Sequence, residues 1–173
     1  IKKTLIKKLD HFMIGGGTVT DVQKDTFNLI DEDHELHATL ELGLQNWAGI
    51  IGLNTAIDWL NKYKPEGRNK NEHEEILSKR LFEGLKNIPD LKIFNKEAST
   101  TISVYSEKID AHRLGLYLSE QNIMCRSGYF CCHYYLKNLL KTPPLLRISF
   151  GLHNKESDVD YLLDVLGKIF SAL

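Results

Sequence analysis

The sequence lacks a hydrophobic run long enough to cross a membrane. Its longest apolar stretches, such as AGIIGL at residues 48–53, are short, whereas a transmembrane helix needs about 20 consecutive apolar residues. The basic opening IKKTLIKKLDHF is not followed by an uninterrupted apolar segment, so it does not resemble a secretory signal. These observations argue against a membrane protein.

Charge of one sign and paired cysteines are also missing. The 22 basic and 23 acidic residues nearly cancel, which gives no global field to attract nucleic acid or an anionic membrane. The chain has three cysteines, an odd number, and Cys131 and Cys132 are adjacent. That usage argues against a secreted disulfide framework. With 42% hydrophobic and 26% charged residues, we expect a reduced, cytoplasmic, globular protein.

The first residue is Ile1 rather than methionine, and it lies within an apparent helix or strand edge. We therefore expect this sequence to be the later part of a longer protein.

The N-terminal third contains a turn, a strand and a helix. GGG at 15–17 breaks regular structure, and TVTDV at 18–22 alternates as a strand does. Residues 24–46 are polar and predict an irregular surface excursion. Apolar residues at spacings of three and four predict a helix from Trp47 to about Tyr63, and KYKPEGRNKN at 62–71 is the best linker.

From residue 72 onward, helices and strands mix. The pattern predicts helices over 72–88, 110–122 (with Asp110 as N-cap) and 156–170, the last capped by side chains of NKES. Strands are predicted at 91–94, 100–106, 123–126 and 145–151. Such an order is typical of an α/β (α+β) layer in which helices cover one sheet face.

The stretch MCRSGYFCCHYYL, residues 124–136, gathers the most reactive side chains. Cys131 lies near Arg126 and His133, and a cation and an imidazole favour the nucleophilic thiolate. A small buried hydrophobe is the other reading of this cysteine. No metal site is predicted, because an adjacent Cys-Cys-His run cannot easily converge on one tetrahedral ion.

Arg147, in LLRISF, interrupts an apolar strand. It is either an edge charge that reaches solvent or an internal clamp for a carboxylate, which its planar fork matches. The GGG segment lacks the context of a phosphate loop and reads as a plain turn. His34, His37, His73 and Glu74 read as surface residues.

Several segments together resemble a known family. GGGTVTDV, LELGLQNWAGIIGLNTAIDWL, HEEILSKRLFEGLKNIPDLKIF, NIMCRSGYFCCHYYL and LLRISFGLHNKESDVDYLLDVLGKIF are similar, in order and spacing, to the C-terminal half of class V aminotransferases. Within that class they most resemble group II cysteine desulfurases and selenocysteine lyases. The resemblance implies a fold-type I pyridoxal-phosphate enzyme, usually a homodimer, with a large domain and a small C-terminal domain.

The resemblance also implies roles for particular residues. The R-x-G-x-x-C motif falls on Arg126, Gly128 and Cys131, which makes Cys131 the persulfide-forming nucleophile. Arg147 falls on the arginine that binds the substrate carboxylate, and Arg126 and Asn154 join it as substrate-binding residues.

Cofactor contacts fall in the N-terminal part of the chain. The glycine turn near the active-site entrance contains Gly16 and Gly17. A segment whose threonine binds the cofactor phosphate in relatives falls on residues 41–46, with Gly43 and Asn46 as cofactor-binding candidates. Here Leu44 replaces that threonine.

The resemblance predicts a cysteine desulfurase that uses pyridoxal 5'-phosphate, with an amino-acid substrate and a possible sulfur-acceptor protein. Tyr129 and Phe130 stand where group II relatives have histidines, so a class V aminotransferase or lyase acting on another amino acid stays open. None of the first four lysines has the context of the Schiff-base lysine, which is expected upstream. Residues 1–63 are thus interpreted as the end of the large domain and residues 64–173 as the complete small domain. The piece alone is expected to be inactive, and a domain that only dimerises or docks with a sulfur acceptor is a further alternative.

Overall fold

The computed structural model describes residues 2–6, 8–9, 13–30 and 40–173. The chain divides into two compact units, Ile1–Lys62 and Tyr63–Leu173, a boundary one residue from the predicted one. Among the described helices, none is both long and apolar enough to span a bilayer.

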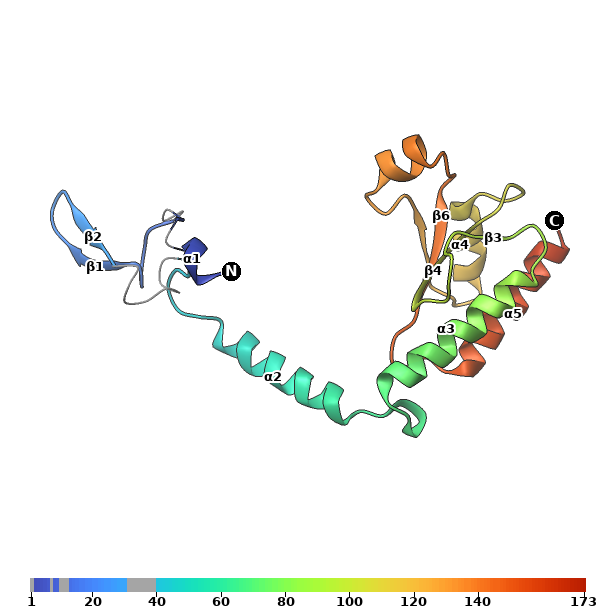
Figure 1. Ribbon diagram of the computed structural model, residues 1–173, viewed down its shortest axis with the longest axis horizontal. Coiled ribbons are helices and arrows are strands. Elements are labelled where there is room, and N and C mark those ends of the chain that lie inside the picture. Colours follow the sequence, from blue (N-terminus) through green and yellow to red (C-terminus); the bar gives the residue numbers. More distant parts are fainter. Residues whose placement is uncertain (1, 7, 10–12, 31–39) are drawn as a thin grey trace. The chain divides into compact units, whose positions relative to one another are not determined.

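The first unit contains a hairpin and a long helix (Figure 1). After a short helix, α1 (Lys3–Ile6), strands β1 (Val19–Val22) and β2 (Phe27–Leu29) pair antiparallel. The expected strand at 18–22 is confirmed, whereas β2 corrects the expectation that residues 24–46 are irregular. The sequence does not predict β2 because it has only three residues and polar neighbours. Its strand conformation depends on hydrogen bonding to β1.

Helix α2 (Trp47–Lys62) confirms the predicted helix, and its N-terminus is capped locally. The side-chain oxygen of Asn46 accepts a hydrogen bond of 2.9 Å from the backbone N–H of Gly49, which satisfies one of the free donors of the first turn. None of the residues of α2 is buried, and several large apolar side chains are more than 35% exposed: Trp47, Ile50, Ile51, Leu53, Ile57, Trp59 and Leu60.

The second unit is a four-stranded antiparallel sheet with helices. Its elements are η1 (Pro65–Gly67), α3 (Lys70–Lys86), β3 (Lys92–Ile93), β4 (Thr101–Tyr105), α4 (Ala111–Glu120), β5 (Arg126–Gly128), the π-helix η2 (Tyr134–Leu139), β6 (Leu145–Ser149) and α5 (Glu156–Ser171). The strand order is β3-β4-β6-β5, so β6, the strand that carries Arg147, lies in the interior of the sheet.

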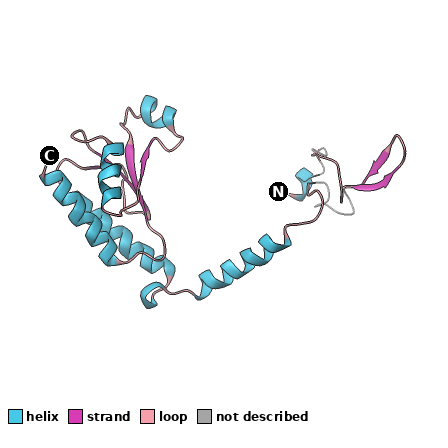
Figure 2. Ribbon diagram, turned by 180° about the vertical axis from the view of Figure 1, so that it is seen from behind, coloured by secondary structure: helices cyan, strands magenta, loops and turns pink. Residues whose placement is uncertain are grey.

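One face of this sheet makes the core. Ile102 and Val104 of β4 and Leu146 and Ile148 of β6 are buried together with apolar residues of α3, α4 and α5. In Figure 2 these three helices lie to one side of the strands. The expected α/β layer with helices over one sheet face is confirmed.

Local caps fix where the helices begin. The carboxylate of Asp110 accepts the backbone N–H of His112 at 2.8 Å, which confirms the predicted N-cap. At α5, the carboxylate of Asp158 accepts the N–H of Lys155 at 3.0 Å. Helix α3 is capped by Asn69, whose side chain accepts the N–H of Glu72 at 2.9 Å.

Two expectations in this unit are wrong. His73 is completely buried rather than exposed, because its ring Nε2 hydrogen-bonds the carbonyl of Asn154 at 2.8 Å and so joins α3 to the loop before α5. The strand expected at 123–126 lies at 126–128 instead, since pairing with β6 begins at Arg126 and Met124 is 92% exposed. His34 and His37 lie outside the described residues.

Candidate active site

The strand register aligns three polar residues in one row across the sheet. Ser103 of β4 lies opposite Arg147 of β6, and Arg147 lies opposite Arg126 of β5. Because Leu146 and Ile148 point into the helix-covered core and side chains alternate along a strand, Arg147 points to the other face. Cross-strand partners share a face, so both guanidinium groups lie on the face without α3, α4 and α5.

This pair of arginines has no acidic partner among the residues that the structure describes. None of the ion pairs among the described residues includes Arg126 or Arg147. Like charges directly opposite each other destabilise a sheet, and Arg147 is half-buried while Arg126 is exposed. The arrangement suits an anion that neutralises both cations, and a carboxylate matches a guanidinium with two parallel hydrogen bonds.

The cysteine loop forms a tight turn that presents Cys131 to solvent. The N–H of Cys132 donates to the carbonyl of Tyr129 at 2.8 Å. The two central residues, Phe130 and Cys131, have φ of 51° and 62°, as in a type I′ turn. L-residues rarely adopt this region, and Cys131 is exposed. The turn therefore exposes Cys131 to solvent while its backbone adopts a strained conformation.

An aromatic ring connects the turn to the arginine row. The guanidinium carbon of Arg147 lies 4.9 Å from the centre of the Phe130 ring, within the range of a cation–π contact. The contact therefore attaches the turn that contains Cys131 to the strand that carries Arg147. Sequence reasoning did not single out Phe130 as a contact of Arg147; its only signal was an aromatic residue beside the candidate nucleophile.

The three cysteines differ in environment. Cys131 and Cys132 are exposed, whereas Cys125 is half-buried. Burial of Cys125 raises the pKa of its thiol from an ordinary 9.0 to about 11, so at neutral pH it is an uncharged, poor nucleophile. Only the exposed pair has access to a substrate.

Asn154 is not brought into this row. Its side-chain oxygen accepts the N–H of Gly151 at 2.9 Å, and its amide nitrogen donates to Asp158 at 3.2 Å. It lines a separate hollow of about 410 Å³ together with Cys125 and Ile148, and Ile148 points to the core side of the sheet. The structure thus gives Asn154 a role in shaping the loop before α5.

The predicted cofactor-binding residues lie in the first unit, where Gly16 and Gly43 bond to each other. The N–H of Gly43 donates to the carbonyl of Gly16 at 2.6 Å. Gly17 and Gly43 have φ of 85° and 67°, which only glycine adopts readily. Asn46 is engaged as the cap of α2. The two glycine segments are thus joined by a backbone hydrogen bond, whereas Asn46 belongs to the start of α2.

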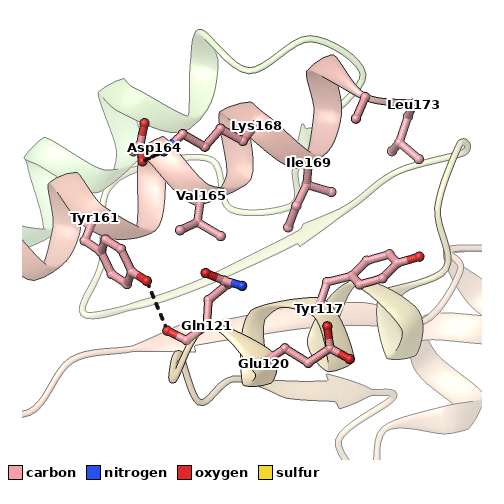
Figure 3. Close-up of a pocket in the computed structure, with 10 residues that line it drawn as sticks. Tyr117, Glu120, Gln121, Tyr161, Asp164, Val165, Lys168, Ile169 and Leu173 are labelled. Atoms are coloured by element: carbon pink, nitrogen blue, oxygen red, sulfur yellow. Dashed lines mark hydrogen bonds and ion pairs between the residues drawn. The ribbon is translucent and has the colours of Figure 1, made fainter.

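A larger groove lies elsewhere on the second unit. It has a volume of about 470 Å³ and runs between α4 and the C-terminal half of α5, where the Tyr161 hydroxyl donates to the carbonyl of Gln121 at 3.3 Å (Figure 3). None of the predicted site residues lines it. Within the described ranges there is no cluster of three or more His, Cys, Asp or Glu side chains that could hold a metal ion.

Comparison with known proteins identifies the family. The family model "Aminotransferase class-V" matches residues 1–162. The chain belongs to the class-V aminotransferases. The resemblance on which the sequence interpretation depends is thereby confirmed.

The similar class-V proteins are cysteine desulfurases. The chain is 32% identical over 173 residues to a probable cysteine desulfurase of Haemophilus influenzae, covering 99% of the chain and 38% of that protein. It is 31% identical to a cysteine desulfurase of Wigglesworthia glossinidia brevipalpis, covering 97% of the chain and 40% of the relative. The chain therefore spans about two fifths of the length of the relatives it matches.

Solved structures of class-V cysteine desulfurases share the fold. The crystal structure of the cysteine desulfurase CsdA from Escherichia coli, in an S-sulfonic acid form, has a TM-score of 0.82 and 26% identity over 99% of this chain and 41% of that one. The apo enzyme of Thermococcus onnurineus has a TM-score of 0.83 and 26% identity, covering 100% and 42%. These matches confirm that the chain has the α/β fold of part of a cysteine desulfurase.

Proposed function

We propose that this chain is the C-terminal segment of a cysteine desulfurase, in which Cys131 receives the sulfur of L-cysteine. The observation that carries the proposal is the contact of Phe130, the residue before the exposed Cys131, with Arg147. Arg147 lies opposite Arg126, and neither arginine forms an ion pair among the described residues. A thiol nucleophile beside a carboxylate-binding site is what the reaction needs. The cysteine desulfurases among the relatives support the same assignment.

The reaction balances without an external oxidant or reductant. The Cys131 thiolate attacks the substrate sulfur, so that a sulfur–sulfur bond forms and the carbon–sulfur bond of the substrate breaks. The electron pair of the broken bond passes to the substrate carbon, which takes up a proton to give alanine. Arg147 and Arg126 hold the α-carboxylate by charge-assisted hydrogen bonds, which orients the substrate sulfur toward the thiol.

Pyridoxal phosphate would supply the electron sink for such a reaction, but three of the candidate contacts in this chain are already engaged in local hydrogen bonds. Gly16 and Gly43 bond to each other, and Asn46 caps α2. Leu44, which stands where relatives have a phosphate-binding threonine, is 91% exposed and has no hydroxyl. We propose that a full-length enzyme supplies the Schiff-base lysine and the groups that hold the cofactor ring. They would come from the region that corresponds to the part of the relatives this chain does not match.

The proposal is tested with Cys131→Ala and Cys132→Ala in the full-length enzyme. Alanine release from L-cysteine should be lost in the first variant and retained in the second, while the cofactor absorbance stays intact in both. The neighbouring cysteine is a matched control because both thiols are exposed on the same loop. Unchanged alanine release in Cys131→Ala would contradict the assignment.

A second candidate function is transamination or lysis of another amino acid. Paired arginines bind any α-carboxylate and do not by themselves select a side chain. Tyr129 and Phe130, in place of the histidines of group II relatives, favour this candidate. Assaying other amino acids with the Cys131→Ala enzyme separates the two, since only the desulfurase depends on the thiol.

Partners and location belong to the same proposal. The apolar side chains that α2 exposes support a homodimer, because large apolar patches mark interfaces. An exposed Cys131 supports transfer of the sulfur to an acceptor protein. Three unpaired cysteines support a reducing, cytoplasmic setting.

A further inference from the structure

The turn that carries Cys131 has a conformation that its own residues disfavour. Its two central positions, Phe130 and Cys131, have φ of 51° and 62°. Turns of this kind favour Asn-Gly or Gly-Gly, because a Cβ atom strains the left-handed region. The hydrogen bond from Cys132 to Tyr129 closes the turn. It joins two backbone groups, so a turn with glycine at the central positions could form it equally well and without the strain. A further interaction must favour this geometry.

The interaction that the structure offers is the contact between Phe130 and Arg147, 4.9 Å from guanidinium carbon to ring centre. Arg147 is a firm anchor because β6 is paired on both sides, with β4 and with β5. The guanidinium lies over the ring and has five N–H donors, so a contact with an aromatic face leaves donors for a carboxylate.

We propose that Phe130 is a positioning residue that couples the substrate-binding arginine to the turn of the nucleophile. The ring restrains the plane of the Arg147 guanidinium, and the guanidinium restrains the ring and thereby the left-handed turn. The catalytic consequence rests on the proposed desulfurase function: the carboxylate and the thiol would be held in one fixed relation. The coupling itself exists without substrate or cofactor.

The coupling is measured by the exchange of the Cys132 amide hydrogen with solvent, followed by NMR in the full chain. Phe130→Leu keeps an apolar side chain but removes the ring, and it should accelerate this exchange at least about threefold, because a turn that opens more often exposes its closing hydrogen bond. Phe130→Tyr keeps the ring and should exchange as the wild type does. Phe94→Leu, an exposed aromatic residue beside β3, is the matched control and should also match the wild type.

A double-mutant cycle shows whether Arg147 is the partner. Arg147→Lys keeps the charge but loses the planar group, and it should accelerate exchange as Phe130→Leu does. The double variant should be no faster than either single variant, because each change removes the same contact. Accelerations that multiply in the double variant, or wild-type exchange in Phe130→Leu, would overturn the proposal.

Kinetics of the full-length holoenzyme test the consequence separately. Phe130→Leu should raise the KM for L-cysteine and lower kcat, since both ends of the coupling are loosened, and Phe130→Tyr should restore both. If exchange responds to Phe130→Leu but desulfuration is absent from the wild-type enzyme, the coupling stands and the proposed function fails. If desulfuration is present and neither exchange nor KM responds, the coupling fails.

Discussion

Arg147 on β6 lies directly opposite Arg126 on β5, and among the described residues neither guanidinium forms an ion pair. Two like charges placed this way cost folding energy. A fold that keeps both has positive charge in place before any anion arrives, which saves the reorganisation that binding would otherwise require.

The first prediction concerns the cost of this pairing. Arg126→Gln should raise the free energy of unfolding of the chain by about 0.5 kcal/mol at low salt, because it relieves a like-charge contact between neighbouring strands. Urea unfolding measures the change. At high salt the gain should shrink, since screening weakens interactions of exposed charges. A loss of stability at low salt would show that Arg126 has a favourable partner.

The second prediction concerns substrate binding. In the full-length enzyme, Arg147→Lys should raise the KM for L-cysteine roughly tenfold or more, because an ammonium group cannot form the two parallel bonds of a guanidinium. Steady-state alanine release measures it. Arg113→Lys is the control, since Arg113 lies on α4 and bonds the Tyr117 hydroxyl. An unchanged KM in Arg147→Lys would place the carboxylate elsewhere.

The third prediction concerns the buried histidine. His73→Leu should lower the free energy of unfolding by about 1–3 kcal/mol, because it leaves the carbonyl of Asn154 without its hydrogen-bond donor inside the protein. Chemical denaturation measures the loss. Asn71→Gln, at an exposed position two residues earlier in α3, should change stability by less than about 0.5 kcal/mol, as surface substitutions usually do. Equal effects of the two changes would contradict the role of His73.

The fourth prediction uses the raised pKa of Cys125. In the folded protein this thiol keeps its proton up to about pH 11, whereas its ordinary pKa is 9.0. Between these values the folded state binds more protons than the unfolded state, so stability falls as pH rises. The difference in unfolding free energy between the wild type and Cys125→Ala should therefore decrease over this range. A constant difference would mean that Cys125 is not the group responsible.

Much of the second unit could be predicted from the sequence because its signals are local. Asp110 precedes an apolar 3.6-residue period and caps α4 as expected. The strand around Arg147 and the final helix have strong periodicity and were found at nearly their observed bounds.

The missed features depend on contacts between distant residues. His73 looks like a surface residue at the polar start of a helix, and only its bond to Asn154, 81 positions away, buries it. The left-handed turn at Phe130 and Cys131 contains no glycine, the residue whose presence would have predicted it. Its anchor, Arg147, lies on another strand, so local propensity could not reveal the turn.

The most direct test of sulfur acceptance by Cys131 is to map the persulfide. The full-length enzyme is mixed with L-cysteine and the persulfide is trapped by alkylation. The protein is then digested, and the masses of its cysteine peptides are measured by mass spectrometry. An additional sulfur atom on Cys131, absent from Cys125 and Cys132, is the predicted result. Alanine release with the additional sulfur on Cys132 instead, or on none of the three, would contradict the account.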